Sequence, residues 1–279
     1  GDDRNFNFYP ACIIEDLEIG DFISIDFNSV LVQVIDKEPG AVVMRVLNAG
    51  VVGQNKAVTV ERDLPLPSLT EKDRAALHIG RDLGLSHFAL SFANEGSNVD
   101  DIRRIVGDDS FVISKIESSN GLENLEEIAE KSNALLIDRG DLSRQIPIEL
   151  IPRTQKQILQ RAKKVNVPVY VATNLLESMV STPTPTRAEV NDIYNTLADG
   201  ADGLVLAAET AIGKYPIACA SMIGKMMRSF ETAHDDTDPY YRADPISQLA
   251  EPLGGRLVHR KATPDDIAEL PSLKVLKVA

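Results

Sequence analysis

The sequence predicts a parallel α/β fold, and three observations carry that prediction. Strand-like and helix-like segments alternate five times along the chain, at a repeat of about 25–35 residues. The predicted strands are short and aliphatic, and aromatic residues make up only 5% of the chain, with no Trp. This pattern fits a closed (β/α) barrel or an open doubly wound sheet. No G-x-G-x-x-G motif follows a strand, which disfavours dinucleotide binding.

The first part of the chain predicts a small β domain within residues 1–62. Residues 20–26 alternate apolar and polar, and strand-like runs follow at 30–35 and 42–47, with Pro39-Gly40 as the turn between them. Two prolines in residues 64–69 interrupt any regular element and mark a boundary.

The second predicted domain, residues 63–233, holds the repeated units. Thr70 and Asp73 form a capping box that starts a helix, which ends near Gly84. Strands are expected at 88–92, 111–117, 134–138, 168–173 and 203–207, followed in turn by helices at 99–106, 121–131, 148–165, 187–199 and 216–232. Residues 234–279 are expected to form a linker and the start of a further domain.

Charge and composition exclude several classes of protein. The net charge of −13, from 29 basic and 42 acidic residues, disfavours binding to nucleic acid or an anionic membrane. No apolar run reaches the roughly 18–20 residues that a membrane span needs. Cys12 and Cys219 lie far apart, which predicts no disulfide framework and a reducing, cytoplasmic compartment.

Candidate functional residues gather where the predicted strands end. Functional groups of a (β/α) barrel collect at the carboxyl ends of its strands, which here selects Ser91, Lys115, Glu117, Arg139, Gly140, Asp141, Thr173, Glu209 and Thr210. Two carboxylates from different strands can share one Mg²⁺. A lysine beside them can neutralise charge on a transferring phosphoryl group or an enolate, and amides that open a helix can bind an anion. These residue types therefore suit chemistry on a phosphorylated oxyacid.

Plainer interpretations stay open for each residue alone. Lys115 and Glu117 are two apart on one strand and share a face, as a solvated ion pair would. Asp141 and Glu209 fit helix caps, and Thr173 fits an ordinary strand position. Their joint position at one end of consecutive strands favours the functional interpretation.

At these residues the sequence resembles pyruvate kinases, from about residue 17 to residue 232. The resemblance rests on residues 66–73, 91–92, 115–117, 139–142, 172–179, 185–189, 209–211, Gly213 and 215–216. It implies a partial TIM (β/α)8 barrel with a small β domain inserted before its βα units, and residues 1–62 would be part of that β domain. The family's first barrel strands and its C-terminal domain are expected to be missing, and five strands do not close an eight-stranded barrel.

The resemblance also implies an activity and residue roles. The activity is that of a glycolytic phosphotransferase, acting on phosphoenolpyruvate or pyruvate and on ADP or ATP. Lys115 and Thr173 would be catalytic, Glu117 and Asp141 would bind Mg²⁺ or Mn²⁺, and Gly140, Asp141 and Thr173 would bind the substrate. K⁺ is implied as well, but its ligands lie in the missing strands. A homo-oligomer is implied, with the loop at residues 186–187 as a subunit contact.

The sequence departs from the family pattern at several positions. Asp138 replaces the usual Ala before Arg-Gly-Asp and adds negative charge near the metal site. Ala207 replaces a serine, Asn174 a glutamine, and Asn94 stands near an expected arginine. These changes keep a second hypothesis open, in which the chain is an inactive module for binding, oligomerisation or regulation. Residues 251–260 and 270–273 faintly resemble the start of ATP sulfurylases, which would make the parent protein a fusion.

Overall fold

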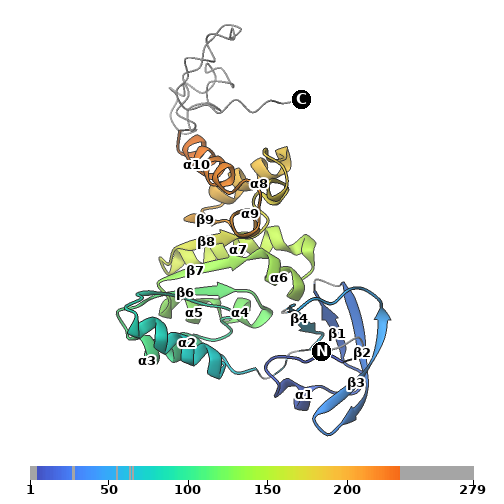
Figure 1. Cartoon of the computed structure of the whole chain (residues 1–279). Coiled ribbons are helices and arrows are strands. Elements are labelled where there is room, and N and C mark those ends of the chain that lie inside the picture. The colour runs from blue at the N-terminus through green and yellow to red at the C-terminus, as the bar shows by residue number, and fades with distance from the viewer. Residues whose placement is uncertain (1–4, 27–28, 55, 63, 65, 233–279) are drawn as a thin grey trace. The chain divides into compact units, whose positions relative to one another are not determined.

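The protein is described by a computed structural model, which defines residues 5–26, 29–54, 56–62, 64 and 66–232 (Figure 1). The chain divides into two compact units, Gly1–Ala220 and Ser221–Ala279, and both sheets belong to the first. The predicted linker and the sulfurylase-like segments lie outside the described residues. None of the helices in the described ranges is long and apolar enough to cross a bilayer.

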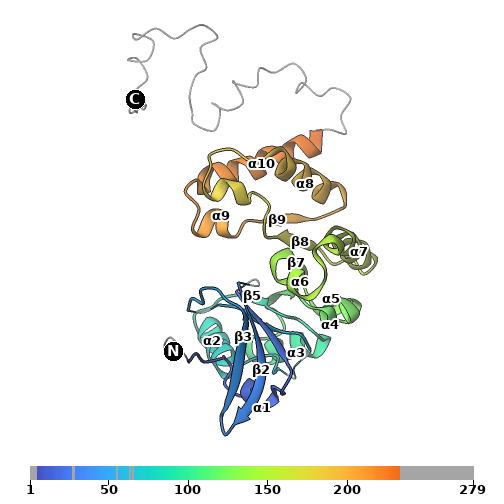
Figure 2. The same ribbon diagram turned by 90° about the vertical axis from the view of Figure 1, so that its right-hand side faces the viewer.

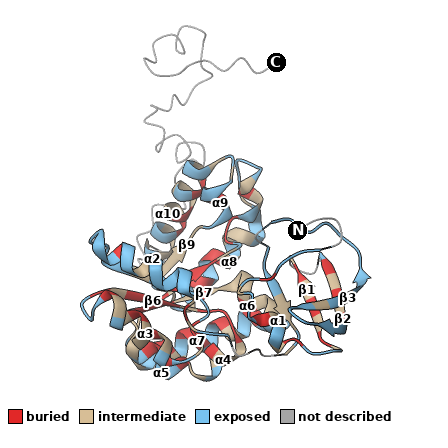
Figure 3. Cartoon of the chain, turned by 60° about the horizontal axis from the view of Figure 1, so that its bottom comes forward, coloured by how far each residue is buried: buried red, intermediate tan, exposed pale blue. Residues whose placement is uncertain are grey.

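The N-terminal residues form a four-stranded antiparallel sheet of order β3-β2-β1-β4. Its strands are β1 (Phe22–Ile25), β2 (Val30–Glu38), β3 (Ala41–Asn48) and β4 (Val58–Val60). Buried residues alternate along β1 and β2 and form a separate apolar cluster (Figure 3). Gly40, at a φ of 74°, makes the predicted turn between β2 and β3. A short helix, α1 (Ile13–Asp16), was not predicted.

The five predicted βα units form an open parallel sheet of order β5-β6-β7-β8-β9 (Figures 1 and 2). Its strands are β5 (His87–Leu90), β6 (Phe111–Ile116), β7 (Ala134–Asp138), β8 (Val169–Ala172) and β9 (Gly203–Val205). Among the described residues, β5 and β9 are the two edges, so the barrel is not closed, as the sequence predicted. The division into a β domain up to residue 62 and a domain of βα units from residue 63 stays a prediction.

The helices follow the strands in chain order. They are α2 (Glu71–Asp82), α3 (Gly96–Val106), α4 (Ser119–Glu123), α5 (Leu125–Lys131), α6 (Arg139–Gln145), α7 (Ile151–Lys164), α8 (Arg187–Ala198), α9 (Ala208–Ala211) and α10 (Pro216–Thr232), with 3₁₀ turns η1 (Ile148–Leu150) and η2 (Glu177–Val180). The segment 121–131, predicted as one helix, breaks at Asn124. Its backbone leaves the helical region, and its side-chain amide donates to the carbonyl of Asn94 at 2.8 Å.

The two faces of the parallel sheet differ in burial. On β6, Val112, Ser114 and Ile116 are fully buried and belong to the face that packs on the helices, whereas the alternate positions are half-buried. Lys115 belongs to this second face. The pleat therefore directs the lysine away from the apolar core while its neighbours in sequence fill that core.

Capping boxes fix the starts of α2, α3 and α8. At α2, the Thr70 hydroxyl accepts from the Asp73 amide and the Asp73 carboxylate accepts from the Thr70 amide, as predicted. At α8, Thr186 and Glu189 repeat the arrangement. Glu189 also accepts from the amide and hydroxyl of Ser178, at 2.7 and 2.6 Å, and so ties α8 to η2.

An ion pair ties the start of β1 to the end of the antiparallel sheet. The Arg62 guanidinium donates two hydrogen bonds to the buried Asp21 carboxylate, at 2.8 and 3.0 Å. The Glu18 amide adds a third at 2.8 Å. Burial alone would raise the pKa of Asp21, but these donors hold it below its ordinary value.

We expect Asp21→Asn to destabilise the antiparallel sheet by about 1–2 kcal/mol, because a charged hydrogen-bonded pair is lost while Arg62 keeps partial access to water. A depressed folded pKa contributes stability that is complete above the ordinary aspartate pKa of about 4 and is lost as pH falls through the folded value. Hydrogen exchange of β1 and β2 amides measures this effect. Asp36→Asn is the matched control, because Asp36 lies in the exposed second half of β2. Equal protection in both variants would contradict the assignment.

We expect Glu189→Ala to destabilise the chain by about 2 kcal/mol, because it removes both the α8 cap and the link to η2. Asp73→Ala removes a capping box that makes no such link, and should cost about 1 kcal/mol or less. Burial would raise the pKa of Glu189, but the Ser178 and Thr186 donors lower it. The difference between the variants should therefore shrink as the pH falls below the ordinary glutamate pKa of about 4 and through the lowered pKa of Glu189. Thermal unfolding followed by circular dichroism tests both expectations.

Candidate functional site

The candidate site lies at the carboxyl edge of the parallel sheet, where β6, β7 and β8 end. Parallel strands present their carboxyl ends at the same edge, so residues far apart in sequence meet there. The register pairs Lys115 with Leu136 and Leu136 with Tyr170. Glu117 follows β6, Asp138 ends β7 and Thr173 follows β8. Three consecutive strand ends therefore supply the polar groups.

Glu117 is a fully buried carboxylate. Its Oε2 accepts a 2.6 Å hydrogen bond from the backbone amide of Phe92, which adopts a left-handed φ of 50° after β5. Its Oε1 lies 2.6 Å from Lys115 Nζ. Burial raises the pKa of Glu117 above its ordinary value, although Lys115 and the Phe92 amide oppose that rise.

Lys115 bridges two carboxylates. Besides Glu117, its ammonium lies 3.2 Å from Asp138 Oδ2. Burial would lower the pKa of Lys115, but the two carboxylates raise it above its ordinary value. The lysine is therefore a fixed positive charge at the strand ends.

Asp138 and Asp141 come from the junction between β7 and α6. Asp138 is the last residue of β7, and Asp141 lies in the first turn of α6, where its carboxylate pairs with Arg144 at 3.2 Å. Burial opposes ionisation of Asp138, but hydrogen bonds from Thr173 and Lys115 hold its pKa below the ordinary value. Gly140 packs closely on Thr173, because a Cβ at position 140 would lie 2.8 Å from Thr173 Cγ2.

Thr173 is held in an unusual backbone conformation. Its φ of 77° is in the left-handed region, which β-branched residues rarely adopt. Its hydroxyl donates to Asp138 Oδ1 at 2.6 Å, and its carbonyl accepts from Arg139 Nη2 at 2.7 Å and Nε at 3.1 Å. Arg139 is fixed in turn by Asp192 of α8, at 2.8 and 3.0 Å. Contacts on both sides of the residue thus maintain a strained geometry at the strand end.

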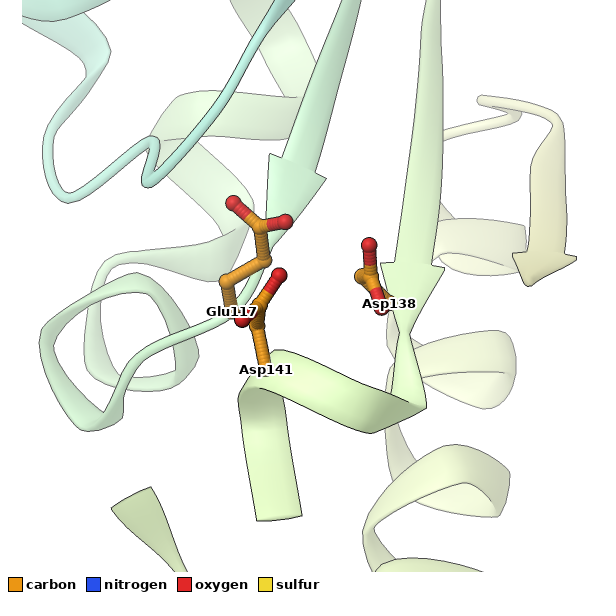
Figure 4. A group of neighbouring side chains, drawn as sticks. All are labelled: Glu117, Asp138 and Asp141. Atoms are coloured by element: carbon orange, nitrogen blue, oxygen red, sulfur yellow. The ribbon is translucent and has the colours of Figure 1, made fainter. Parts of the chain in front are cut away.

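Three carboxylates converge in this site. One oxygen each from Glu117, Asp138 and Asp141 lies within 4.8 Å of the other two, and the three side chains point toward one another (Figure 4). In the part of the chain that the structure describes, Glu117 Oε1 is buried and no donor meets it at hydrogen-bond geometry, despite the close Lys115 ammonium. Carboxylate oxygens are the ligands that Mg²⁺ and Mn²⁺ prefer. The donor set therefore fits a hard divalent cation.

The five residues to which the resemblance assigned roles, Lys115, Glu117, Gly140, Asp141 and Thr173, lie at this edge. Glu117 and Asp141 belong to the group of three carboxylates, and Lys115 pairs with Glu117. Gly140 and Thr173 pack against each other beside this group. The contacts of Asp138 with Lys115 and Thr173 were missed. Strand parity could have found them, because Asp138 and Leu136 share a face and Leu136 pairs with Lys115.

Glu209 has a structural role, as its plainer interpretation allowed. It is 2% exposed, and its two oxygens accept from the backbone amides of Leu176 and Ala207, at 3.0 and 2.9 Å. The carboxylate therefore anchors the loop after β8 to the start of α9. It is not among the three carboxylates that converge on one another.

Comparison with known proteins agrees with this arrangement. The model of the pyruvate kinase barrel domain matches residues 1–220. A pyruvate kinase of Agrobacterium vitis is 38% identical over 229 residues, which are 82% of this chain and 46% of that protein. A pyruvate kinase of Geobacillus stearothermophilus is 35% identical over 260 residues, covering 90% of this chain and 44% of the relative. One of Aeropyrum pernix is 36% identical over 277 residues, with coverages of 94% and 60%.

The chain spans about half the length of these curated relatives. The family model covers the antiparallel sheet and all five strands of the parallel sheet, and it ends within α10. The resemblance that the sequence motifs predicted is thereby confirmed, and the open sheet agrees with a partial barrel. The chain belongs to the pyruvate kinase family.

Proposed function

We propose that this chain carries the metal and phosphoenolpyruvate half of a phosphotransferase site, for phosphoryl transfer between phosphoenolpyruvate and ADP with Mg²⁺ or Mn²⁺. The observation that carries the proposal is the meeting of Lys115 with Glu117, beside Asp141, at the carboxyl edge of the sheet. The relatives named as pyruvate kinases support the activity class.

Glu117 and Asp141 would hold the metal. When bound, the cation supplies positive charge that polarises substrate oxygens and offsets charge in the transition state. Glu117 suits this role because its buried carboxylate lies beside Asp141, the Lys115 ammonium neutralises Oε1, and the Phe92 amide fixes the other oxygen. Asp141 suits it because α6 begins at Arg139 and directs the carboxylate toward Glu117 (Figure 4).

Lys115 would neutralise negative charge on the transferring phosphoryl group and on the enolate oxygen. Its raised pKa keeps the ammonium charged at neutral pH, so it would act as an electrostatic group and not as a base. Its contacts with Glu117 and Asp138 fix the side chain before substrate binds, which limits the reorganisation that catalysis requires.

Gly140, Asp141 and Thr173 would bind the carboxylate end of the substrate. Amides in the first turn of a helix lack intrahelical acceptors and can donate to an anion. The absence of a side chain at Gly140 keeps Thr173 close to these amides. The Thr173 hydroxyl donates to Asp138, so its oxygen lone pairs remain able to accept a hydrogen bond from a water or from a donor group on the substrate side.

Other parts of the family function stay predictions. ADP as the acceptor, K⁺ as a second cation, a homo-oligomeric state and a cytoplasmic location follow from the resemblance alone. The second hypothesis, an inactive binding or regulatory module, becomes the better account if the half-site binds neither metal nor a substrate analogue.

We expect the chain to bind oxalate, a planar mimic of enolpyruvate, only in the presence of Mg²⁺. Asp141→Asn should weaken that binding at least tenfold, about the loss that altered metal coordination causes. Lys115→Met should also weaken it, because a positive charge next to the anion is removed. Calorimetric titration of the three proteins measures this, with exposed Asp82→Asn as the matched control.

Circular dichroism of each variant separates a lost site from a lost fold. Oxalate binding without Mg²⁺, or binding that Asp141→Asn leaves intact, would contradict the proposed metal site. No binding by a folded wild-type chain would favour the inactive module.

A further inference from the structure

Asp138 brings a second carboxylate to the lysine of the site. Its Oδ2 lies 3.2 Å from Lys115 Nζ, and Glu117 Oε1 lies 2.6 Å from the same nitrogen. Asp138 reaches the lysine because Leu136 pairs with Lys115 in the register and Asp138 follows two residues later on the same face of β7. One ammonium therefore contacts two carboxylates.

The second carboxylate exceeds what the lysine neutralises. Lys115 carries one positive charge, and the shorter contact with Glu117 already compensates it. Asp141 pairs separately with Arg144 at 3.2 Å. Three carboxylates and two cations leave one net negative charge, which is the charge that Asp138 adds.

Arg139, the next residue in the chain, does not compensate Asp138. Its guanidinium donates to the Thr173 carbonyl at 2.7 Å and to the Asp192 carboxylate at 2.8 Å. Among the described residues, Lys115 is the cation that forms an ion pair with Asp138. The Thr173 hydroxyl donates to Asp138 Oδ1 at 2.6 Å, which fixes the carboxylate in place without neutralising it.

The charge of Asp138 is poorly screened. The side chains of Asp138 and Lys115 are 16% and 22% exposed, and water and salt screen such charges less than they screen charges on an open surface. Burial opposes ionisation, but the hydrogen bond from Thr173 and the charge of Lys115 hold the pKa of Asp138 below its ordinary value. Asp138 therefore acts on any anion beside Lys115 as a fixed negative charge.

This charge acts most strongly on the most highly charged ligand. Coulomb energy is proportional to the charge of the ligand, so Asp138 repels a dianion twice as strongly as a monoanion in the same position. With a divalent cation bound, the three carboxylates, Lys115 and Arg144 leave a net charge of +1, which a single carboxylate balances. Without the charge of Asp138 the total would be +2, which a dianion balances.

We propose that Asp138 is a specificity-determining residue, whose charge beside Lys115 shifts the preference of the half-site away from doubly charged enolate-like and phosphorylated ligands and toward singly charged 2-oxo acids. The inference rests on the proposed function and concerns the charge of the ligand that the site prefers. It requires no bond from Asp138 to the metal, because the effect is on the anion that approaches Lys115.

The test compares oxalate, a dianion, with pyruvate, a monoanion of similar size, by calorimetric titration of the full chain at saturating Mg²⁺. Asp138→Asn keeps the side-chain shape and an oxygen that accepts from Thr173, but removes the charge. It should tighten oxalate binding about tenfold and pyruvate binding only about threefold, because the repulsion scales with ligand charge. Asp138→Ala, which also frees the Thr173 hydroxyl, should raise the preference for oxalate over pyruvate by the same factor. Exposed Asp82→Asn should change neither affinity.

The ratio of the two affinities separates charge from structure. Altered packing around Thr173 would change both ligands by one factor, so an unchanged or lowered oxalate preference in Asp138→Asn would overturn the inference while the metal half-site stands. Mg²⁺ is raised in each variant until the affinity for oxalate no longer changes, so a different metal affinity does not enter the comparison. If folded wild type and both Asp138 variants bind neither ligand with Mg²⁺, the proposed function fails together with this inference.

Discussion

The ion pair between Lys115 and the buried Glu117 is the interaction on which the site depends. A carboxylate with no solvent exposure at the end of a strand must be compensated, and this one is compensated by an ammonium 2.6 Å away and by the Phe92 amide. The hydrogen bond from the Phe92 amide to Glu117 links the end of β6 to the segment that follows β5. It also brings a positive charge to the place where Asp138 and Asp141 add two negative ones. The lysine therefore stabilises the carboxylates of Glu117 and Asp138, which otherwise repel each other, and Arg144 pairs with Asp141.

The parallel register of β6, β7 and β8 brings their carboxyl ends to one edge of the sheet, and the strained backbone of Thr173 shapes that edge. β6, β7 and β8 end at successive positions, so short polar side chains just beyond the strands reach one another. Thr173 must then turn its hydroxyl toward Asp138, which its left-handed backbone allows. Gly140 leaves room for this turn, since any side chain there would meet the Thr173 methyl group. The mobility that a loop would normally have is removed by contacts on both sides of the threonine.

The sequence predicted most of the fold because periodicity and caps are local signals. All five parallel strands, the Thr70 capping box and the turn at Gly40 followed from short segments. Lys115, Glu117 and Asp141 were selected because strand ends are easy to recognise. The break at Asn124 was not predictable, because it depends on a hydrogen bond to Asn94, 30 residues away. The partners of Asp138 and the conformation of Thr173 likewise depend on contacts between strands, which single-segment patterns do not contain.

The link from Asp192 through Arg139 to Thr173 joins the surface to the reactive edge. Asp192 is 40% exposed on α8, whereas Arg139 is 12% exposed, and the guanidinium spans the distance between a surface helix and a backbone carbonyl beside the acidic group. Position 192 is thus a mechanical anchor despite its exposure. Neutralising the Asp192 carboxylate would release the Arg139 side chain and, with it, the turn that follows β8. Amino-acid substitutions at position 192 should therefore be tolerated less well than at other surface positions of α8.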